Sequence, residues 1–162
     1  MKKIIALLAA LILLLSLTAC SSGSREKAFS KNGLDITLTN EFSEETLSGY
    51  TACYRSTHTM VVTLKEDFSL IEGAADLSVT EYAELLRQAN ASRSPTSLST
   101  KDGIPYFEYT YFNESENVTY RYYTTAFKGS DAFWMVQFVC NETAYVTQKV
   151  NFSTWAKSIS VS

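Results

Sequence analysis

The stretch YRYYTTAFKGSDAFWMVQFVC, residues 120–140, decides the fold because it holds two strand patterns joined by one tight turn. On both sides of Gly129-Ser130, large apolar side chains alternate with polar or small ones, as in strands that bury one face. Glycine in the first turn position predicts a type II′ turn. The sequence therefore predicts an antiparallel hairpin of residues 118–128 and 131–140.

Other strand patterns flank this hairpin in the chain. Asp102-Gly103 predicts a type I′ turn between two earlier strands, and residues 113–117 connect the second of them to the hairpin. Near the start, an alternating apolar pattern follows the turn residues Asn32-Gly33. The further strands are predicted at residues 29–39, 50–54, 59–64, 96–101 and 104–112, with a polar loop over 40–49.

Two helices are also predicted. Ser78 and Glu81 form a capping box ahead of an apolar stripe, so the first helix begins after Ser78 and ends near Asn90. The tail, residues 141–162, is predicted to be helical because its apolar residues repeat at a helical period. These residues are Tyr145, Phe152, Trp155, Ala156 and Ile159. The pattern as a whole predicts an α+β fold, an antiparallel β-sheet meander flanked by helices.

The turn at Gly129 sets a trial register in which Lys128 pairs with Asp131. Alternation then gives the meander one apolar face and one mixed face, and Arg121 falls on the apolar face, where a buried charge needs a partner. The apolar face carries Phe107, Tyr109, Tyr111, Tyr123, Phe127, Trp134, Val136 and Phe138. On the mixed face, the candidate ligand-binding residues are Tyr106, Glu108, Tyr120, Tyr122 and Gln137. Glu108 is either a polar anchor in this aromatic surface or a rim residue paired with a Tyr hydroxyl or a lysine.

The amino terminus has the order of an export signal. Lys2 and Lys3 precede an apolar run that is shorter than the roughly 20 residues needed to span a bilayer. The run ends in Leu17-Thr18-Ala19-Cys20, which resembles the lipobox of bacterial lipoproteins. The resemblance implies cleavage after residue 19 and acylation of Cys20 with a diacylglyceryl group and chains such as palmitate. The alternative is an ordinary secretory signal with a chance cysteine.

Acylation of Cys20 would define the organisation and the location of the chain. Residues 1–19 would be the lipoprotein signal peptide, residues 20–28 a flexible tether, and residues 29–162 a single exported domain. The lipid would hold the domain on a bilayer, its first partner. That bilayer is the outer face of the cell membrane in a Gram-positive cell, or an envelope membrane in a Gram-negative one.

Charge and cysteine content limit the chemistry. Loss of Lys2 and Lys3 with the signal leaves 12 basic side chains against 17 acidic ones, without a basic cluster, so nucleic acid is not an expected partner. Cys53 and Cys140 remain once Cys20 is acylated. In an exported domain they could form a disulfide, or they could stay buried as small apolar thiols.

No catalytic, cofactor or metal site is predicted. His58 is the single histidine, so a zinc site would have to combine it with Cys53 and Cys140. A hydrolase would have to use it as the base for Cys53 or a serine. Neither a Gly-x-Ser-x-Gly elbow nor a phosphate-binding glycine loop occurs. We expect His58 to be a solvated loop residue between two strands.

Five segments occur in a fixed order along residues 28–162: FSKNGLDITLTNEF, LSVTEYAELL, KDGIPYFEYTY, YRYYTTAFKGSDAFWMVQFVC and FSTWAKSISV. Their order resembles the PsbP-like superfamily, which includes the extrinsic oxygen-evolving subunit of photosystem II and a nuclear Ran-release factor. The resemblance implies a sheet flanked by helices and a non-enzymatic role as a docking or assembly module. It transfers no functional residue to this chain.

The sequence therefore favours a membrane-anchored, non-enzymatic binding or assembly module whose partner is an envelope protein, a glycan or a small ligand. Two alternatives stay open. One is a small cell-envelope hydrolase or metal-dependent enzyme that uses His58 with nearby carboxylates. The other is a structural envelope protein without a ligand.

Overall fold

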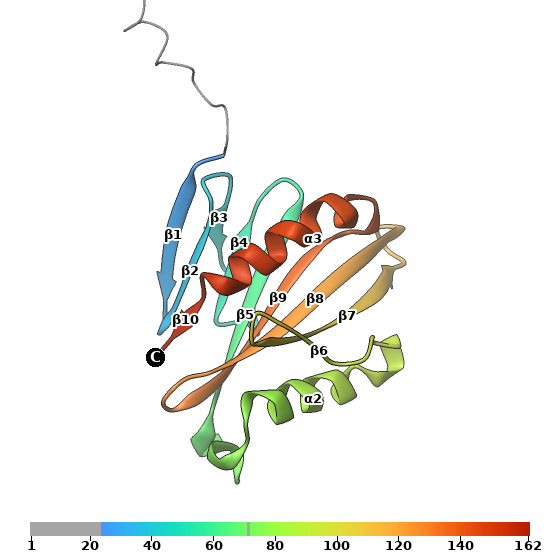
Figure 1. Ribbon diagram of the computed structural model, residues 1–162. Coiled ribbons are helices and arrows are strands. Elements are labelled where there is room, and N and C mark those ends of the chain that lie inside the picture. The colour runs from blue at the N-terminus through green and yellow to red at the C-terminus, as the bar shows by residue number, and fades with distance from the viewer. Residues whose placement is uncertain (1–23, 71) are drawn as a thin grey trace, which may run out of the picture.

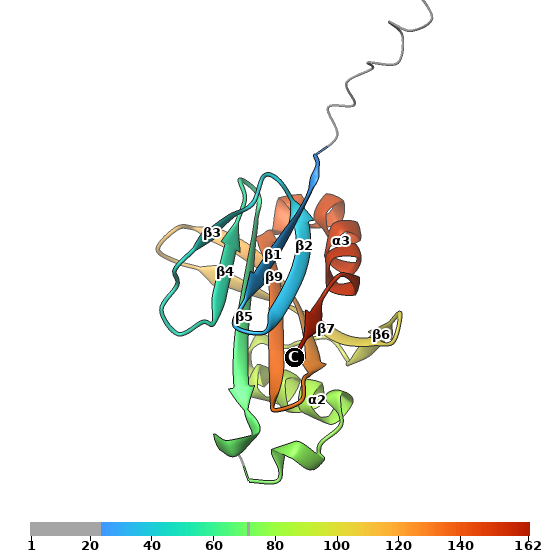
Figure 2. The same ribbon diagram turned by 90° about the vertical axis from the view of Figure 1, so that its left-hand side faces the viewer.

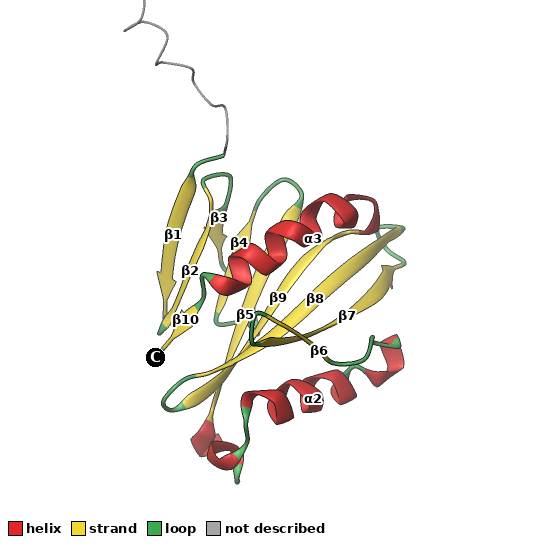
Figure 3. Cartoon of the chain, in the orientation of Figure 1, coloured by secondary structure: helices red, strands yellow, loops and turns green. Residues whose placement is uncertain are grey.

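The computed structural model describes residues 24–70 and 72–162, in which two antiparallel sheets are combined with two α-helices (Figures 1 and 3). The strands are β1 (Glu26–Lys31), β2 (Leu34–Thr39), β3 (Ser43–Glu45), β4 (Ala52–Arg55), β5 (Thr59–Asp67), β6 (Ser99–Lys101), β7 (Ile104–Asn113), β8 (Val118–Lys128), β9 (Ala132–Asn141) and β10 (Ser160–Val161). The helices are α2 (Val79–Ala89) and α3 (Glu142–Lys157), with 3-10 turns η1 (Phe68–Leu70), η2 (Ala74–Asp76) and η3 (Ala91–Arg93). The α+β class is confirmed.

The predicted signal peptide and Cys20 lie outside the described residues. Within residues 24–70 and 72–162, no helix is both long enough and apolar enough to cross a membrane.

The large sheet has the strand order β3-β4-β5-β9-β8-β7-β6, so the predicted hairpin of β8 and β9 lies at its centre. One side of this sheet, the covered face, carries Tyr123, Val136 and Phe138. Helix α3 crosses it diagonally (Figure 1), and Phe152 of the helix stacks on Phe138 with ring centroids 5.4 Å apart. Burial of these large side chains on one face is the main reason for the arrangement.

The small sheet, in the order β1-β2-β10, packs on the same covered face (Figure 2). The single strand predicted over residues 29–39 is wrong: Asn32 and Gly33 adopt positive φ angles of 52° and 94° and reverse the chain into a hairpin. β1 begins at Glu26, so the last residues of the predicted tether belong to this sheet. The helix predicted over residues 141–162 is too long. Helix α3 ends at Lys157, and the strand that follows, β10, pairs with β2.

Helix α2 begins as predicted. The Ser78 hydroxyl accepts a hydrogen bond from the Glu81 N–H, and the Glu81 carboxylate accepts one from the Ser78 N–H at 2.8 Å. Tyr82 of this helix stacks on Phe133 of β9 with ring centroids 4.2 Å apart. Phe133 points away from the covered face, so α2 packs on the opposite side of the sheet and contacts only one end of it.

The opposite side, here called the open face, carries Met60, Tyr122 and Val139, which lie on neighbouring strands in register. Its central hairpin has a different turn from the one predicted. Lys128 pairs with Phe133 rather than Asp131, and the Gly129 N–H donates to the Ala132 carbonyl across a longer loop. A shift of two residues leaves every side chain of β9 on its predicted face. By contrast, the type I′ turn at Asp102-Gly103 is confirmed, with φ angles of 54° and 81°.

The pairing of β7 with β8 differs by one residue, and this moves every side chain of β7 to the other face. Asn113 is the last residue of β7 and pairs with Val118, because its side-chain oxygen accepts the Ser115 N–H at 3.1 Å and closes a shorter loop. Tyr111 consequently pairs with Tyr120. The open face therefore carries Phe107, Tyr109 and Tyr111, which were predicted to lie on the apolar face, whereas Tyr106 and Glu108 lie on the covered face.

Candidate functional site

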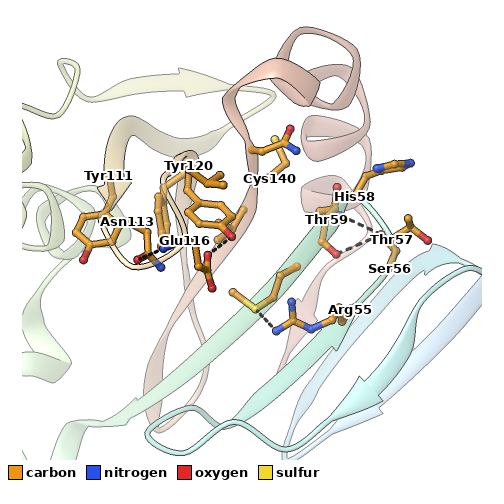
Figure 4. A pocket seen from close by; sticks show the side chains of 15 residues that line it. Arg55, Ser56, Thr57, His58, Thr59, Tyr111, Asn113, Glu116, Tyr120 and Cys140 are labelled. Carbon is orange, nitrogen blue, oxygen red and sulfur yellow. Dashed lines mark hydrogen bonds between the residues drawn. The ribbon is translucent and has the colours of Figure 1, made fainter.

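A groove of about 400 Å³ occupies the half of the open face that α2 does not contact (Figure 4). It lies between the β4–β5 turn on one side and the β7–β8 turn on the other, across β9 and β8. The side chains used below are those of Arg55, Met60, Tyr111, Asn113, Glu116, Tyr120, Tyr122, Val139 and Asn141, all of which line it. This volume is at the lower end of ligand-binding cavities, so the groove suits a small ligand or a short part of a longer one.

Strand alternation brings the tyrosines of the groove together. Tyr109 and Tyr122 lie opposite each other and stack, with ring centroids 4.6 Å apart and planes 8° from parallel. Tyr111 and Tyr120 form the next pair towards the β7–β8 turn, but their rings diverge. The Arg93 guanidinium lies over the Tyr111 ring at 5.6 Å, while the Tyr120 hydroxyl donates to Glu116 at 2.5 Å. Tyr111 is 43% exposed, so the outer pair presents aromatic surface to a ligand.

The charged groups of the groove already have partners within the protein. Arg55 donates through Nε to Glu45 at 2.8 Å and through Nη2 to the Met60 sulfur at 3.3 Å. Glu116 accepts the Tyr120 hydroxyl, and this hydrogen bond, together with burial, raises the pKa of Tyr120. The charge of Arg55 is thus paired, whereas Glu116 keeps its negative charge beside a neutral hydroxyl, and Arg93 over Tyr111 supplies a positive one.

Towards α2 the groove ends in a buried polar cluster. Gln137 is 5% exposed and donates through Nε2 to the Tyr109 hydroxyl at 3.0 Å and to Thr124 at 3.2 Å. Burial, reinforced by the neighbouring Tyr109 hydroxyl, raises the pKa of Tyr122 to about 12. The Tyr122 hydroxyl therefore stays protonated at neutral pH and can both donate and accept a hydrogen bond.

The structure brings together only part of the predicted ligand face. Tyr120 and Tyr122 lie in the groove, and Gln137 lies on the same face but is buried at the inner end. Tyr106 and Glu108 face the other side, because the β7–β8 register differs by one residue. Tyr106 stacks on Tyr123 beneath the helix layer at a centroid distance of 4.6 Å, so it takes no part in the groove.

Glu108 is a buried structural residue. It is paired with a lysine, which is one of the two roles that the sequence suggested for it. Its carboxylate lies 2.6 Å from Lys149 Nζ on α3 and 3.3 Å from Arg121 Nη2 on β8. Arg121 thereby has the partner that its place on the apolar face requires, and its guanidinium also lies 4.4 Å from the Tyr145 ring centroid. Burial alone would raise the pKa of Glu108, but the hydrogen bonds to Lys149 and Arg121 help to lower it.

The candidate disulfide between Cys53 and Cys140 is wrong, because both residues are buried free thiols. They lie on strands separated by β5, and the register places Cys53 on the open side and Cys140 on the covered side. Burial raises the pKa of Cys53, and it raises that of Cys140 to about 11. Both thiols are therefore protonated at neutral pH and are poor nucleophiles.

His58 lies at the exposed tip of the β4–β5 turn, where the Ser56 N–H bonds to the Thr59 carbonyl at 2.8 Å. Across residues 24–70 and 72–162, no hydrogen bond to its ring is present, and no group of three or more His, Cys, Asp or Glu side chains is placed to hold a metal ion. Figure 4 shows its ring at the edge of the groove, pointing away from Tyr120.

Of the nine groove residues named above, seven were not predicted as site residues from the sequence: Arg55, Met60, Tyr111, Asn113, Glu116, Val139 and Asn141. One signal could have found Tyr111. The asparagine that opens the Asn113–Asn117 loop can accept backbone N–H groups and end the strand at residue 113, which places Tyr111 opposite Tyr120. Arg55 and Met60 reach the groove because β5 pairs with β9. These two strands are far apart in the sequence, so no local pattern predicts their pairing.

Neither a protein-family model nor a curated protein matches the sequence. Among solved structures, the fold is similar to that of cyanobacterial PsbP (CyanoP) from Synechocystis sp. PCC 6803, with a TM-score of 0.56 and 12% identity over 91% of this chain and 99% of that one. It is also similar to a protein from Bacteroides thetaiotaomicron VPI-5482, with a TM-score of 0.51 and 8% identity over 86% of this chain and 48% of that one. The PsbP-like fold is thereby confirmed, and at this level of identity the similarity concerns the fold alone.

Proposed function

We propose that this PsbP-like chain is a non-enzymatic binding module, exported and held at the outer face of a membrane through acylated Cys20. Its ligand occupies the groove on the open sheet face. Acylation would confine the domain to partners that lie within reach of the membrane surface.

One observation carries the proposal: half of an otherwise covered sheet is left as a groove with exposed aromatic side chains. The covered face packs against α3 and the small sheet, and α2 packs on one end of the other face. Tyr111, Tyr120 and Arg55 lie beyond that end, at least partly open to solvent. Amphipathic aromatic and arginine side chains gathered in one concave surface are typical of recognition sites.

The hydrolase alternative has less support from the geometry. A histidine that acts as a general base must lie within hydrogen-bond reach of the group that it activates, and His58 has no such neighbour among the described residues. The high pKa values of the two thiols also argue against a cysteine nucleophile.

The proposal is tested by hydroxyl-radical footprinting, which works even when the ligand is unidentified. The oxidation rates of Tyr111 and Tyr120 are compared between intact cells and the purified chain. We expect both tyrosines to be protected in cells. The matched control is Phe112, a neighbour that is 51% exposed but points to the other face. Equal oxidation of Tyr111 and Tyr120 in cells and in the purified chain would contradict the proposal.

A further inference from the structure

The groove combines three features that together restrict the chemistry of its ligand: compensated charges, unused hydrogen-bonding groups of both kinds, and divergent aromatic rings. From these features we infer that the ligand is a neutral glycan, an inference that rests on the proposed function of the groove.

The first feature is charge compensation. The Arg55 guanidinium is paired with Glu45. The two remaining charges are of opposite sign: the Glu116 carboxylate, which accepts the neutral Tyr120 hydroxyl, and the Arg93 guanidinium over the Tyr111 ring. No lysine lines the groove, and His58 lies only at its edge. An anionic ligand would have to compete with Glu45 for Arg55 and would be repelled by Glu116. A cationic ligand could reach Glu116 Oε1 but would be repelled by the Arg93 guanidinium over the Tyr111 ring. Binding of a charged group without a new partner is unfavourable, so the groove favours an uncharged ligand.

The second feature is the set of hydrogen-bonding groups that remain. The side-chain oxygens of Asn113 and Asn141 are used within the protein, the former by the β7–β8 turn and the latter as the cap of α3. The amide N–H₂ of each residue is left to donate, while Glu116 Oε1 is left to accept. Sugar hydroxyls donate and accept in the same small volume, which matches this mixed set.

The third feature is the pair of outer rings. Tyr111 turns towards Arg93 and Tyr120 towards Glu116, so the rings do not cover each other as those of Tyr109 and Tyr122 do. The face of an aromatic ring carries partial negative charge and attracts the weakly positive C–H groups on the flat side of a sugar ring.

An extended peptide fits this surface less well. Peptides usually bind to a sheet by adding a strand at its edge, where backbone N–H and C=O groups are unpaired. The groove instead lies over β5, β9 and β8, and each of the last two strands is hydrogen-bonded to a neighbour on both sides. The backbone of a peptide in the groove would therefore find few partners.

The test uses the whole chain, purified in a detergent without sugar groups and labelled for NMR. It is titrated with tetramers of β-1,4-linked N-acetylglucosamine, of cellulose and of maltose, and with trigalacturonic acid as the acidic counterpart. At least one neutral tetramer should bind with a dissociation constant of about 1 mM or below and should shift the amide signals of residues 55–60 and 111–120. Tyr120→Ala should weaken this binding by about fivefold or more, whereas Phe112→Ala should leave it unchanged.

Three results would overturn the inference: no binding by any neutral tetramer, stronger binding of the acidic sugar, or binding that is unaffected by Tyr120→Ala. A folding defect in that variant would be visible in its amide spectrum, and Tyr111→Ala then provides the same comparison. The footprinting experiment separates the two proposals, because protection of the groove in cells without sugar binding would reject the glycan and retain the binding module.

Discussion

Lys149 and Glu108 join helix α3 to the middle of strand β7, with the ammonium nitrogen 2.6 Å from the carboxylate of a side chain that is 7% exposed. Arg121 on β8 contacts the other oxygen of the same carboxylate. The buried charge therefore has two partners and connects the helix layer to the sheet, at a position directly behind the open face.

Replacement Glu108→Gln should destabilise the fold, because it keeps the size of the side chain but removes the counter-charge of Lys149 and leaves Arg121 with only Glu142, 3.8 Å away. We expect the free energy of unfolding to fall by about 1–3 kcal/mol, measured by urea denaturation. The control is Glu44→Gln, which removes a surface ion pair to Lys31 in which the side chains are 42% and 36% exposed. That change should cost about 0.5 kcal/mol or less. Equal decreases in the free energy of unfolding would show that the buried ion pair contributes no more to stability than the surface pair.

The same carboxyl group should make stability depend on acid. Burial raises the pKa of Glu108, but its hydrogen bonds, first that to Lys149, lower it below the ordinary value of 4.5. A carboxyl group whose pKa is lower in the folded state stabilises the fold above its unfolded pKa, and this contribution is lost as the pH falls through the folded pKa. The free energy of unfolding should therefore decline below about pH 4.5, and less steeply in Glu108→Gln. Parallel curves for wild type and variant would contradict this assignment.

The thiol content should report on both burial and acylation. The sequence has three cysteines, of which Cys53 and Cys140 are buried free thiols. We expect no reaction with a thiol reagent in the native protein, because both thiols are protonated and inaccessible. After denaturation, two thiols per chain should react if Cys20 is acylated. Three reactive thiols would argue against acylation, and none would indicate a disulfide that the structure does not contain.

Acylation itself is tested by growing cells with an azide-tagged fatty acid. The wild-type chain should carry the tag and should sediment with membranes. Cys20→Ala should lose the tag and should remain as an uncleaved precursor, because the acceptor sulfur is missing. Cys53→Ala serves as the control and should be tagged like the wild type. An untagged wild-type chain that is nevertheless cleaved would identify the segment as an ordinary secretory signal.

The features that could be predicted from the sequence are those determined by neighbouring residues. Ser78 and Glu81 are three residues apart and cap α2 by themselves, and Asp102-Gly103 fixes its turn through two positive φ angles. The tail helix was predicted but not its end at Lys157, because pairing of β10 with β2 involves residues far apart in sequence.

Which side chains of β7 face the candidate site depends on the residue at which this strand ends. With Asn113 counted in the loop, the sequence places Glu108 beside Tyr122; with Asn113 in the strand, Glu108 pairs with Tyr123 and moves beneath α3. Composition does not reveal this difference, because both faces of β7 carry aromatic and polar side chains. Arg55 could not be assigned to the groove without the pairing of β5 with β9, which lie far apart in the sequence.

The central claim, that the groove is where the chain meets its ligand, is tested most directly by photo-cross-linking in living cells. A photoreactive phenylalanine is placed at position 111 in one strain and at position 112 in another, since these adjacent side chains are both exposed but face opposite sides of β7. We expect a covalent adduct from position 111 and none from position 112. No adduct from position 111, or the same adduct from both positions, would contradict the claim.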